Sequence, residues 1–288
     1  FRLLEDAREV RIEEHPKAQA NGERKADKLL QTLRQAGIEL FHDELGVPYA
    51  TIPQNGSRMV LSIEGATFKR WLSHLGFEET GEAPSTETLR STMNVVAGQA
   101  TFKEVMRTLR VRIMWQEGAI WYDLGDWRAV KITEKGWEVV QKPPILFRHY
   151  SSQKIQAEPA SGGDVHNVLS LLNLKEPHSR LLFITDLVAG LVPGIAHPVS
   201  VFCGPHGSAK SCILRYKREL QDPVQVPYTS MPKNVETFAQ TAYHNLCMFF
   251  DNVSSLKPWI SDALCRYCTG DGFFKRKLYY DDDDVVYK

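Results

Sequence analysis

The stretch that most constrains the fold is an apolar run, residues 198–203, which leads into a glycine-containing turn that ends in Lys210 and Ser211. Gly204, Lys210 and Ser211 have the spacing of the phosphate-loop pattern G-x-x-x-x-G-K-[S/T], with Ala209 in place of the second glycine. The pattern predicts a buried strand, a loop that wraps around a phosphate group, and the first turn of a helix.

The residue types in this loop suit the binding of phosphate. Gly204 and Gly207 permit the dihedral angles that let several backbone N–H groups point inward. The helix beginning near Lys210 adds the positive end of its dipole, the Lys210 ammonium can bridge two phosphates, and the Ser211 hydroxyl can ligate Mg²⁺. A methyl group at Ala209 is tolerable only at a negative φ, so we expect a slightly altered loop. The predicted nucleotide contacts are Gly204, Pro205, His206, Gly207, Ser208, Ala209, Lys210, Ser211 and Cys212.

A second motif lies about forty residues downstream. Residues 246–251 are an apolar run that ends in Asp251, as expected for a buried parallel strand that carries a Mg²⁺-coordinating carboxylate. We therefore predict ATP and Mg²⁺ as cofactors, Ser211 and Asp251 as metal ligands, and Lys210, Asp251 and Asn252 as catalytic residues. The alternative is a glycine turn that only connects a core strand to a helix, and the second motif argues against it.

Composition indicates an ordinary globular protein and leaves open whether it binds nucleic acid. The 288 residues are 43% hydrophobic and carry 35 basic and 35 acidic side chains, so we expect a globular protein of two domains. No apolar run is long enough to cross a bilayer and no signal peptide is recognisable, which predicts a cytoplasmic protein without membrane contact. Balanced charge still allows nucleic-acid binding by one basic face or pore. Cys265 and Cys268 have C-x-x-C spacing without a second pair, which favours packing within a helix over zinc.

The predicted fold class is α/β. Residues 1–150 are expected to form an α+β accessory domain with antiparallel strands, residues 151–163 a linker, and residues 164–288 a P-loop domain that is incomplete at its C-terminal end. We expect Pro16 and Asn21-Gly22 to end any early helix, and Ser85 or Thr86 to cap another. In the accessory domain the patterns predict helices at 23–36, 68–75 and 87–100, and strands at 38–41, 49–52, 59–63, 108–115, 119–124, 129–133 and 137–141.

The C-terminal part alternates apolar runs with helical patterns. A helix near 178–191 is apolar on nearly every face and should therefore be buried. A hairpin with an acidic tip, residues 281–284, should join residues 278–280 to residues 285–287. The remaining expected elements are helices at about 165–174, 210–220, 234–244 and 258–268 and strands at 198–203, 224–228 and 246–251.

With these residues identified, the C-terminal half resembles the ATPase domain of phage- and plasmid-type superfamily 3 (D5-like) replicative helicases, of the AAA+ class. The resemblance rests on residues 204–211, on residues 246–252, and on Thr269-Gly-Asp-Gly272 followed by residues 274–279. It implies a parallel-sheet ATPase core, a homo-oligomeric ring that is hexameric in this family, and single-stranded DNA drawn through a central pore with the use of ATP.

The resemblance also gives a role to a basic triplet. It implies that Lys275 or Lys277 lies near the pore, so Lys275, Arg276 and Lys277 are the predicted DNA contacts. By itself the triplet is equally consistent with a solvated strand edge and with a loop that touches a phosphate backbone.

The chain departs from the family pattern at three points. Ala209 replaces a glycine, Asn252 stands where a second carboxylate is usual, and the sensor Asn and arginine finger are expected beyond the C-terminal end. The predicted function is an ATP-dependent DNA helicase or translocase of a phage or mobile element, acting in DNA replication. The alternative is a nucleotide-binding switch or scaffold with weak turnover, because the Asn252 amide cannot accept a proton. A small-molecule kinase is disfavoured, because no lid-like arginine cluster is present.

Overall fold

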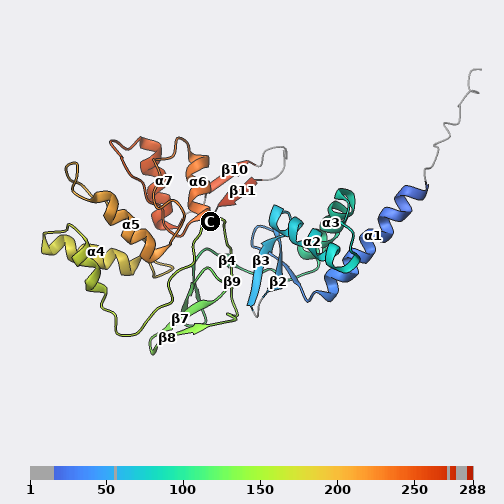
Figure 1. The fold of residues 1–288 in the computed structure, drawn as a ribbon. Coiled ribbons are helices and arrows are strands. Elements are labelled where there is room, and N and C mark those ends of the chain that lie inside the picture. Colours follow the sequence, from blue (N-terminus) through green and yellow to red (C-terminus); the bar gives the residue numbers. More distant parts are fainter. Residues whose placement is uncertain (1–15, 55–56, 271–272, 277–283, 288) are drawn as a thin grey trace, which may run out of the picture. The chain divides into compact units, whose positions relative to one another are not determined.

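The computed structural model describes residues 16–54, 57–270, 273–276 and 284–287. The chain divides into two compact units, whose elements are labelled in Figure 1. Unit 1 comprises Phe1–His42, Gly46–Pro53 and Leu61–Met106, and unit 2 comprises Asp43–Leu45, Gln54–Val60 and Arg107–Lys288. The predicted boundary near residue 150 does not coincide with this division, because the strands that follow residue 107 belong to the same unit as the phosphate loop.

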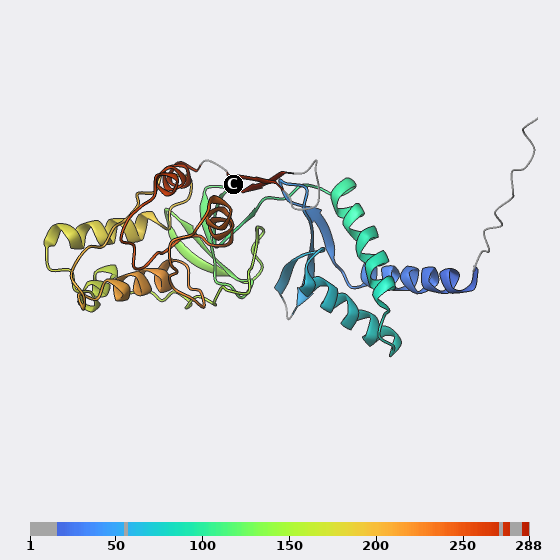
Figure 2. The same cartoon turned by 90° about the horizontal axis from the view of Figure 1, so that it is seen from above.

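The described residues up to Phe102 contain helices beside a sheet of three strands in the order β1-β2-β3. The third helix packs against both the first helix and the first strand, as Figure 2 shows (blue and teal ribbons). The predicted helices and strands of this stretch are confirmed. Its elements are α1 (Pro16–Gln35), β1 (Glu39–His42), β2 (Pro48–Gln54), β3 (Ser57–Ser62), α2 (Ala66–Thr80) and α3 (Thr86–Phe102).

The N-terminal end of α1 differs from the prediction, whereas that of α3 agrees with it. Contrary to prediction, Pro16 begins α1 instead of ending a helix, and Gly22 lies within it. Proline is tolerated in a first helical turn, because the N–H that it lacks would have no intrahelical partner there. Ser85 caps α3 as predicted, since its side chain accepts a hydrogen bond of 3.1 Å from the Thr88 N–H.

Unit 2 begins with the predicted meander. Four strands pair antiparallel in the order β5-β6-β7-β8, and a short parallel pair, β4 with β9, lies outside that sheet. The strand predicted over 108–115 is interrupted, because Arg112 takes a φ of 62° and its side chain is fully buried. The strands are β4 (Leu109–Arg110), β5 (Ile113–Gln116), β6 (Ala119–Asp123), β7 (Ala129–Thr133), β8 (Gly136–Val140) and β9 (Leu146–Phe147).

The helices of unit 2 largely follow the prediction. They are the 3₁₀ helix η1 (Val165–Leu171) and the α-helices α4 (Pro177–Ala189), α5 (Lys210–Gln221), α6 (Val235–His244) and α7 (Pro258–Thr269). The first of them is shorter and more tightly wound than the α-helix expected over 165–174. No described helix of the chain is both long and apolar enough to cross a bilayer.

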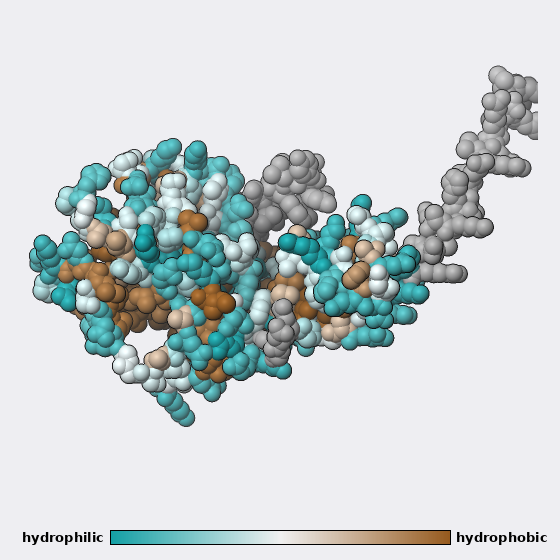
Figure 3. Space-filling view, viewed as in Figure 1, coloured by the Kyte–Doolittle hydropathy of each residue, from teal (hydrophilic) through white to brown (hydrophobic). Residues whose placement is uncertain are grey.

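The apolar helix α4 is not buried on all sides, contrary to prediction. Phe183 and Leu187 are buried, whereas Leu181 and Leu182 are 65% and 54% exposed. The hydrophobic surface over α4 is visible in Figure 3 as a brown region. One stripe of the helix is therefore enough to anchor it, through the cluster that includes Leu169 and Ile213.

The strands predicted near the phosphate loop do not form ladders. Residues 198–203 form no strand, and their backbone makes no hydrogen bond to another described residue. Residues 246–251 have a single parallel bridge, from Phe250 to Thr229, with the Thr229 N–H bonded to the Phe249 carbonyl at 3.0 Å. A ladder needs a neighbouring strand within hydrogen-bonding distance, and both segments instead border a large cavity. The parallel-sheet ATPase core therefore stays a prediction.

The predicted linker, residues 151–163, has fixed contacts. The Lys154 N–H donates to the Pro223 carbonyl at 2.9 Å, and the Gln156 N–H donates to the Leu124 carbonyl at 2.7 Å. These bonds hold the first part of the segment against the chain that follows α5 and against the chain that follows β6.

The C-terminal hairpin pairs earlier in the sequence than predicted. β10 (Phe273–Arg276) pairs antiparallel with β11 (Asp284–Tyr287), with Phe273 opposite Tyr287. The apolar patterns before and after the acidic run allow more than one register, and pattern alone did not decide between them. Residues 277–283, which include most of the predicted tip, lie outside the described residues.

Candidate functional site

The phosphate loop connects segment 198–203 to α5. Gly204 has a φ of 157°, and a Cβ placed there would lie 2.8 Å from the Ser208 Oγ. Gly207 has a φ of 77° with open space around it. Conformation and the contact with Ser208 both favour glycine at position 204, while conformation alone favours it at 207, in agreement with the predicted role of both residues.

The backbone of Ala209 contradicts the prediction of a negative φ. Its φ of 63° and ψ of 24° are left-handed, and it occupies the N-cap position of α5. An L-residue other than glycine pays about 1–2 kcal/mol in this conformation, because its Cβ crowds the following carbonyl oxygen. The loop therefore keeps a conformation suited to glycine at the cost of local strain, instead of changing its shape to fit alanine.

The Lys210 ammonium lies over the loop. Its Nζ donates to the carbonyl oxygens of Gly204 and Pro205, each at 2.8 Å, and to the Ser208 Oγ at 3.3 Å. These acceptors hold the positive charge of Lys210 against the turn.

Several amides of the loop are free to bind an anion. Among the residues that the structure describes, the N–H groups of Gly207, Ala209, Lys210 and Ser211 have no acceptor. They lie at the positive end of the α5 dipole, where unpaired amides and the dipole both favour negative charge. Together with Lys210, this donor set fits a phosphate group.

The two predicted metal ligands are in contact. The Ser211 Oγ donates to the Asp251 Oδ2 at 2.7 Å. Two backbone contacts orient Asp251: its Oδ1 accepts from the Asn252 N–H at 2.9 Å, and its own N–H donates to the Thr229 carbonyl at 3.0 Å. A hydroxyl beside a carboxylate is a set of hard oxygen ligands, which is the chemistry that Mg²⁺ prefers.

The remaining predicted site residues lie at the surface of the site or outside it. Asn252 is exposed, has a φ of 57°, and touches Asp251 through its backbone. His206 and Cys212 are exposed on the loop and on the first turn of α5. Lys275 and Arg276 lie in β10, and Lys277 lies outside the described residues.

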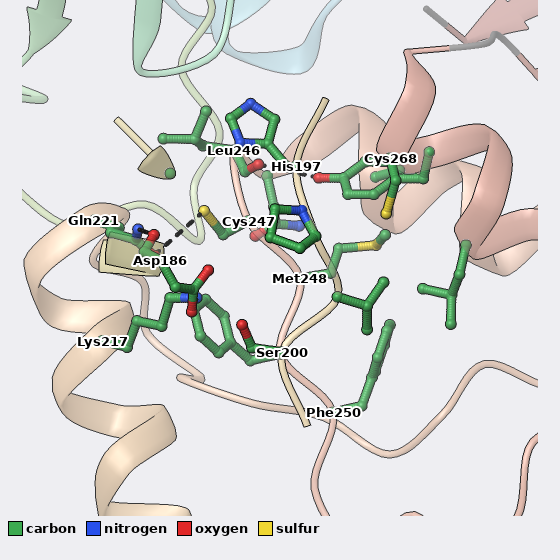
Figure 4. A pocket seen from close by; sticks show the side chains of 18 of the residues that line it. Asp186, His197, Ser200, Lys217, Gln221, Leu246, Cys247, Met248, Phe250 and Cys268 are labelled. Atoms are coloured by element: carbon green, nitrogen blue, oxygen red, sulfur yellow. Dashed lines mark hydrogen bonds and ion pairs between the residues drawn. The ribbon is translucent and has the colours of Figure 1, made fainter. Parts of the chain in front are cut away.

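A cavity of about 1140 Å³ extends from this site into unit 2. Segments 192–204 and 245–256 both line it, and Lys210 and Asp251 lie at its border. Val201, which is 75% exposed, is among its lining residues. Figure 4 shows the deeper part, where a Lys217–Asp186 ion pair lies near the ring of His197. The space next to the phosphate loop is therefore large and partly apolar, as a nucleotide base and sugar require.

Burial controls the protonation of the groups that line the cavity. It raises the pKa of the Cys247 thiol to about 12, and the Asp222 carboxylate adds to that effect. It also lowers the pKa of His197, against the opposing influence of Asp186. Both groups are consequently neutral at pH 7, and neither supplies a reactive thiolate nor a cation to the cavity.

Sequence patterns missed several residues that hold the site together. Thr229 positions Asp251, the Asn173 side chain donates to the Ser208 carbonyl at 3.4 Å, and Asp222 bonds to the start of segment 245–256. Asp222-Pro223 is readable from sequence only as the end of a helix. No local sequence pattern predicts these contacts, because each joins residues far apart in the chain.

Residues 165–288 match the family model described as actinomycete integrative conjugative element replication protein. The match covers less than half of the chain and includes the phosphate loop, Asp251 and the C-terminal hairpin. No curated protein and no solved structure matches the chain significantly. The C-terminal part of the chain is thus similar to a family of mobile-element replication proteins, and the finer resemblance to superfamily 3 helicases stays a prediction.

Proposed function

We propose that this chain is a replication protein of a mobile genetic element and that its unit 2 is a P-loop, AAA+-like ATPase of a DNA helicase or translocase. The observation that carries the proposal is the 2.7 Å hydrogen bond between Ser211 and Asp251. It joins the ends of two motifs that lie forty residues apart in sequence, beside unpaired loop amides and the Lys210 ammonium. Further support comes from the similarity of residues 165–288 to a replication protein family.

Each residue of the site has a defined part in this function. The loop amides and Lys210 bind the β- and γ-phosphates, for which Lys210 leaves the carbonyl oxygens of Gly204 and Pro205. Ser211 and Asp251 would hold Mg²⁺ directly or through water, which would supply positive charge beside the phosphates. Asn252 orients the attacking water, because a loose transition state needs positioning more than base strength.

The proposed partners are single-stranded DNA and further copies of this chain. Lys275, Arg276 and Lys277 contact the DNA backbone, and the subunits form a ring, a hexamer by the family resemblance. Nucleotide turnover between subunits then moves the basic hairpin along the strand.

One observation favours a second candidate, a nucleotide-binding switch or scaffold with weak turnover. Asn252 follows Asp251 where a carboxylate could have activated water, and its exposed side chain offers an amide that cannot accept a proton. This candidate predicts assembly that depends on ATP, with little stimulation by DNA.

The test measures ATP hydrolysis by the purified full chain with and without single-stranded DNA. Wild type should be stimulated by DNA, and Lys210→Ala should lose at least about tenfold in kcat/KM, because it removes the charge on the phosphates. Lys233→Ala removes an exposed lysine outside the site and serves as the matched control. Wild-type turnover by the Lys210 variant would contradict the ATPase proposal. Tight ATP binding without DNA-stimulated turnover would favour the switch.

A further inference from the structure

The Asp222 carboxylate joins three elements at the end of α5 that lies opposite the phosphate loop. The side chain is fully buried. Its Oδ1 accepts from the Arg112 Nε at 3.1 Å, and its Oδ2 accepts from the backbone N–H groups of Leu246 at 2.9 Å and Cys247 at 3.3 Å. One carboxylate therefore holds together α5, the meander and the start of the segment that ends in Asp251.

Arg112 fixes this carboxylate in place. Its guanidinium has no exposed surface and donates to the carbonyls of Asp123 at 3.3 Å and Pro223 at 2.9 Å, and also to that of Lys154. The pair is thus fully desolvated and fully hydrogen-bonded, an arrangement in which the loss of either partner is costly. The left-handed backbone of Arg112, which interrupts the first strand of the meander, turns this side chain inward.

Helix α5 and the segment 246–251 run antiparallel. From Ser211 to Asp222 the helix rises about 16 Å at 1.5 Å per residue. The two are bonded at one end through Asp222 and Leu246, and at the other end through Ser211 and Asp251.

Contacts between these two ends keep the segment against the helix. The Arg218 guanidinium donates to the Cys247 carbonyl and lies over the Phe249 ring, with its Cζ 5.4 Å from the ring centroid. The Lys217 ammonium lies 5.7 Å from the same centroid. Figure 4 shows Lys217 of α5 close to the residues of the segment. The segment is therefore in contact with the helix between the two bonded ends as well.

We propose that Asp222 is a positioning residue for the magnesium ligands, and that Arg112 makes the meander part of the nucleotide site. This inference rests on the proposed function. Asp222 sets the register between α5 and segment 246–251, so that Ser211 and Asp251 face each other. The loop amides and Lys210 do not depend on this register, because they lie within one continuous piece of chain. Substitution of Asp222 should therefore weaken the binding of Mg²⁺ and leave the direct binding of phosphate unchanged.

The experiment measures ADP binding to the full chain by isothermal titration calorimetry, once with excess Mg²⁺ and once with EDTA. In wild type, Mg²⁺ should increase the affinity for ADP. Asp222→Asn keeps the shape but cannot accept from both Arg112 and the two amides. We expect Asp222→Asn to reduce, by roughly tenfold, the factor by which Mg²⁺ increases the affinity for ADP. A loss of this size is typical for residues that orient metal ligands. Affinity in EDTA should stay within about twofold of wild type, since the phosphate contacts are intact.

Two further variants keep the proposal falsifiable. Asp126→Asn weakens another ion pair of unit 2, with Arg128, whose second acidic partner is Glu158, and it should retain the full increase in ADP affinity that Mg²⁺ produces in wild type. Tyr267→Phe removes only the 3.0 Å hydrogen bond to the Leu246 carbonyl, and it should lose part of the gain even if Asp222→Asn does not fold.

A folded Asp222→Asn protein with an undiminished gain, or with a parallel loss of affinity in EDTA, would overturn the positioning role. The same holds for Tyr267→Phe if it retains the full gain. Absence of ADP binding to wild type would instead refute the proposed function itself, together with this role.

Discussion

Replacing Ala209 by glycine should stabilise unit 2. Ala209 is held at a φ of 63°, where an L-residue is strained by about 1–2 kcal/mol and glycine is not. Glycine also makes the unfolded chain more flexible, which offsets about 0.4–1 kcal/mol of that gain. The net effect is a stabilisation of about 0.5–1 kcal/mol, which raises the Tm of a unit of this size by about 1–4 °C.

The assay is differential scanning calorimetry of wild type and Ala209→Gly, read at the transition of unit 2. Ala242→Gly is the matched control, because Ala242 lies within α6, where the same substitution should destabilise by about 1 kcal/mol. The two variants should shift the Tm in opposite directions. If Ala209→Gly lowers the Tm as Ala242→Gly does, Ala209 has the negative φ expected from sequence, and the strained-loop interpretation is refuted.

Two other predictions concern the loop and the histidine at the end of α6. Gly204→Ala should weaken ADP binding much more than Gly207→Ala. The new Cβ at position 204 would lie 2.8 Å from the Ser208 Oγ, whereas a Cβ at position 207 would meet no atom within 4 Å. Calorimetric titration of ADP into both variants checks this, and equal losses of affinity would contradict it. Burial, and then the Arg148 charge, lower the pKa of His244 below its usual 6.5, so the unfolded chain binds the proton more readily. The stability that this group contributes is present above pH 6.5 and is lost as the pH falls through the lowered pKa. The Tm of wild type should accordingly fall more between pH 7.5 and 5.5 than that of His244→Gln, and parallel pH profiles would show that His244 titrates normally.

Sequence alone determined those features whose physical cause is local. The spacing of apolar residues gave α5, α6 and α7, and the cap of α3 followed from Ser85. The phosphate-loop pattern identified Lys210 and Ser211, because glycine conformations, unpaired amides and the helix dipole all depend on neighbouring residues. The carboxylate that meets Ser211 was also predictable, since an apolar run that ends in aspartate is itself a local pattern.

Only the tertiary structure decided what depends on distant parts of the chain. The left-handed Ala209, the interruption at Arg112 and the register of β10 with β11 all follow from contacts that no short window contains. The apolar patterns of segments 198–203 and 246–251 predict strands, but a strand exists only where a neighbour supplies hydrogen bonds. Asp222 looked like the end of a helix, and the fold makes it the point that joins three elements. A buried charge is stable only with its partners in place, and besides Arg218 one turn away, Asp222 finds them in Arg112 and in the backbone of Leu246, far away in the sequence.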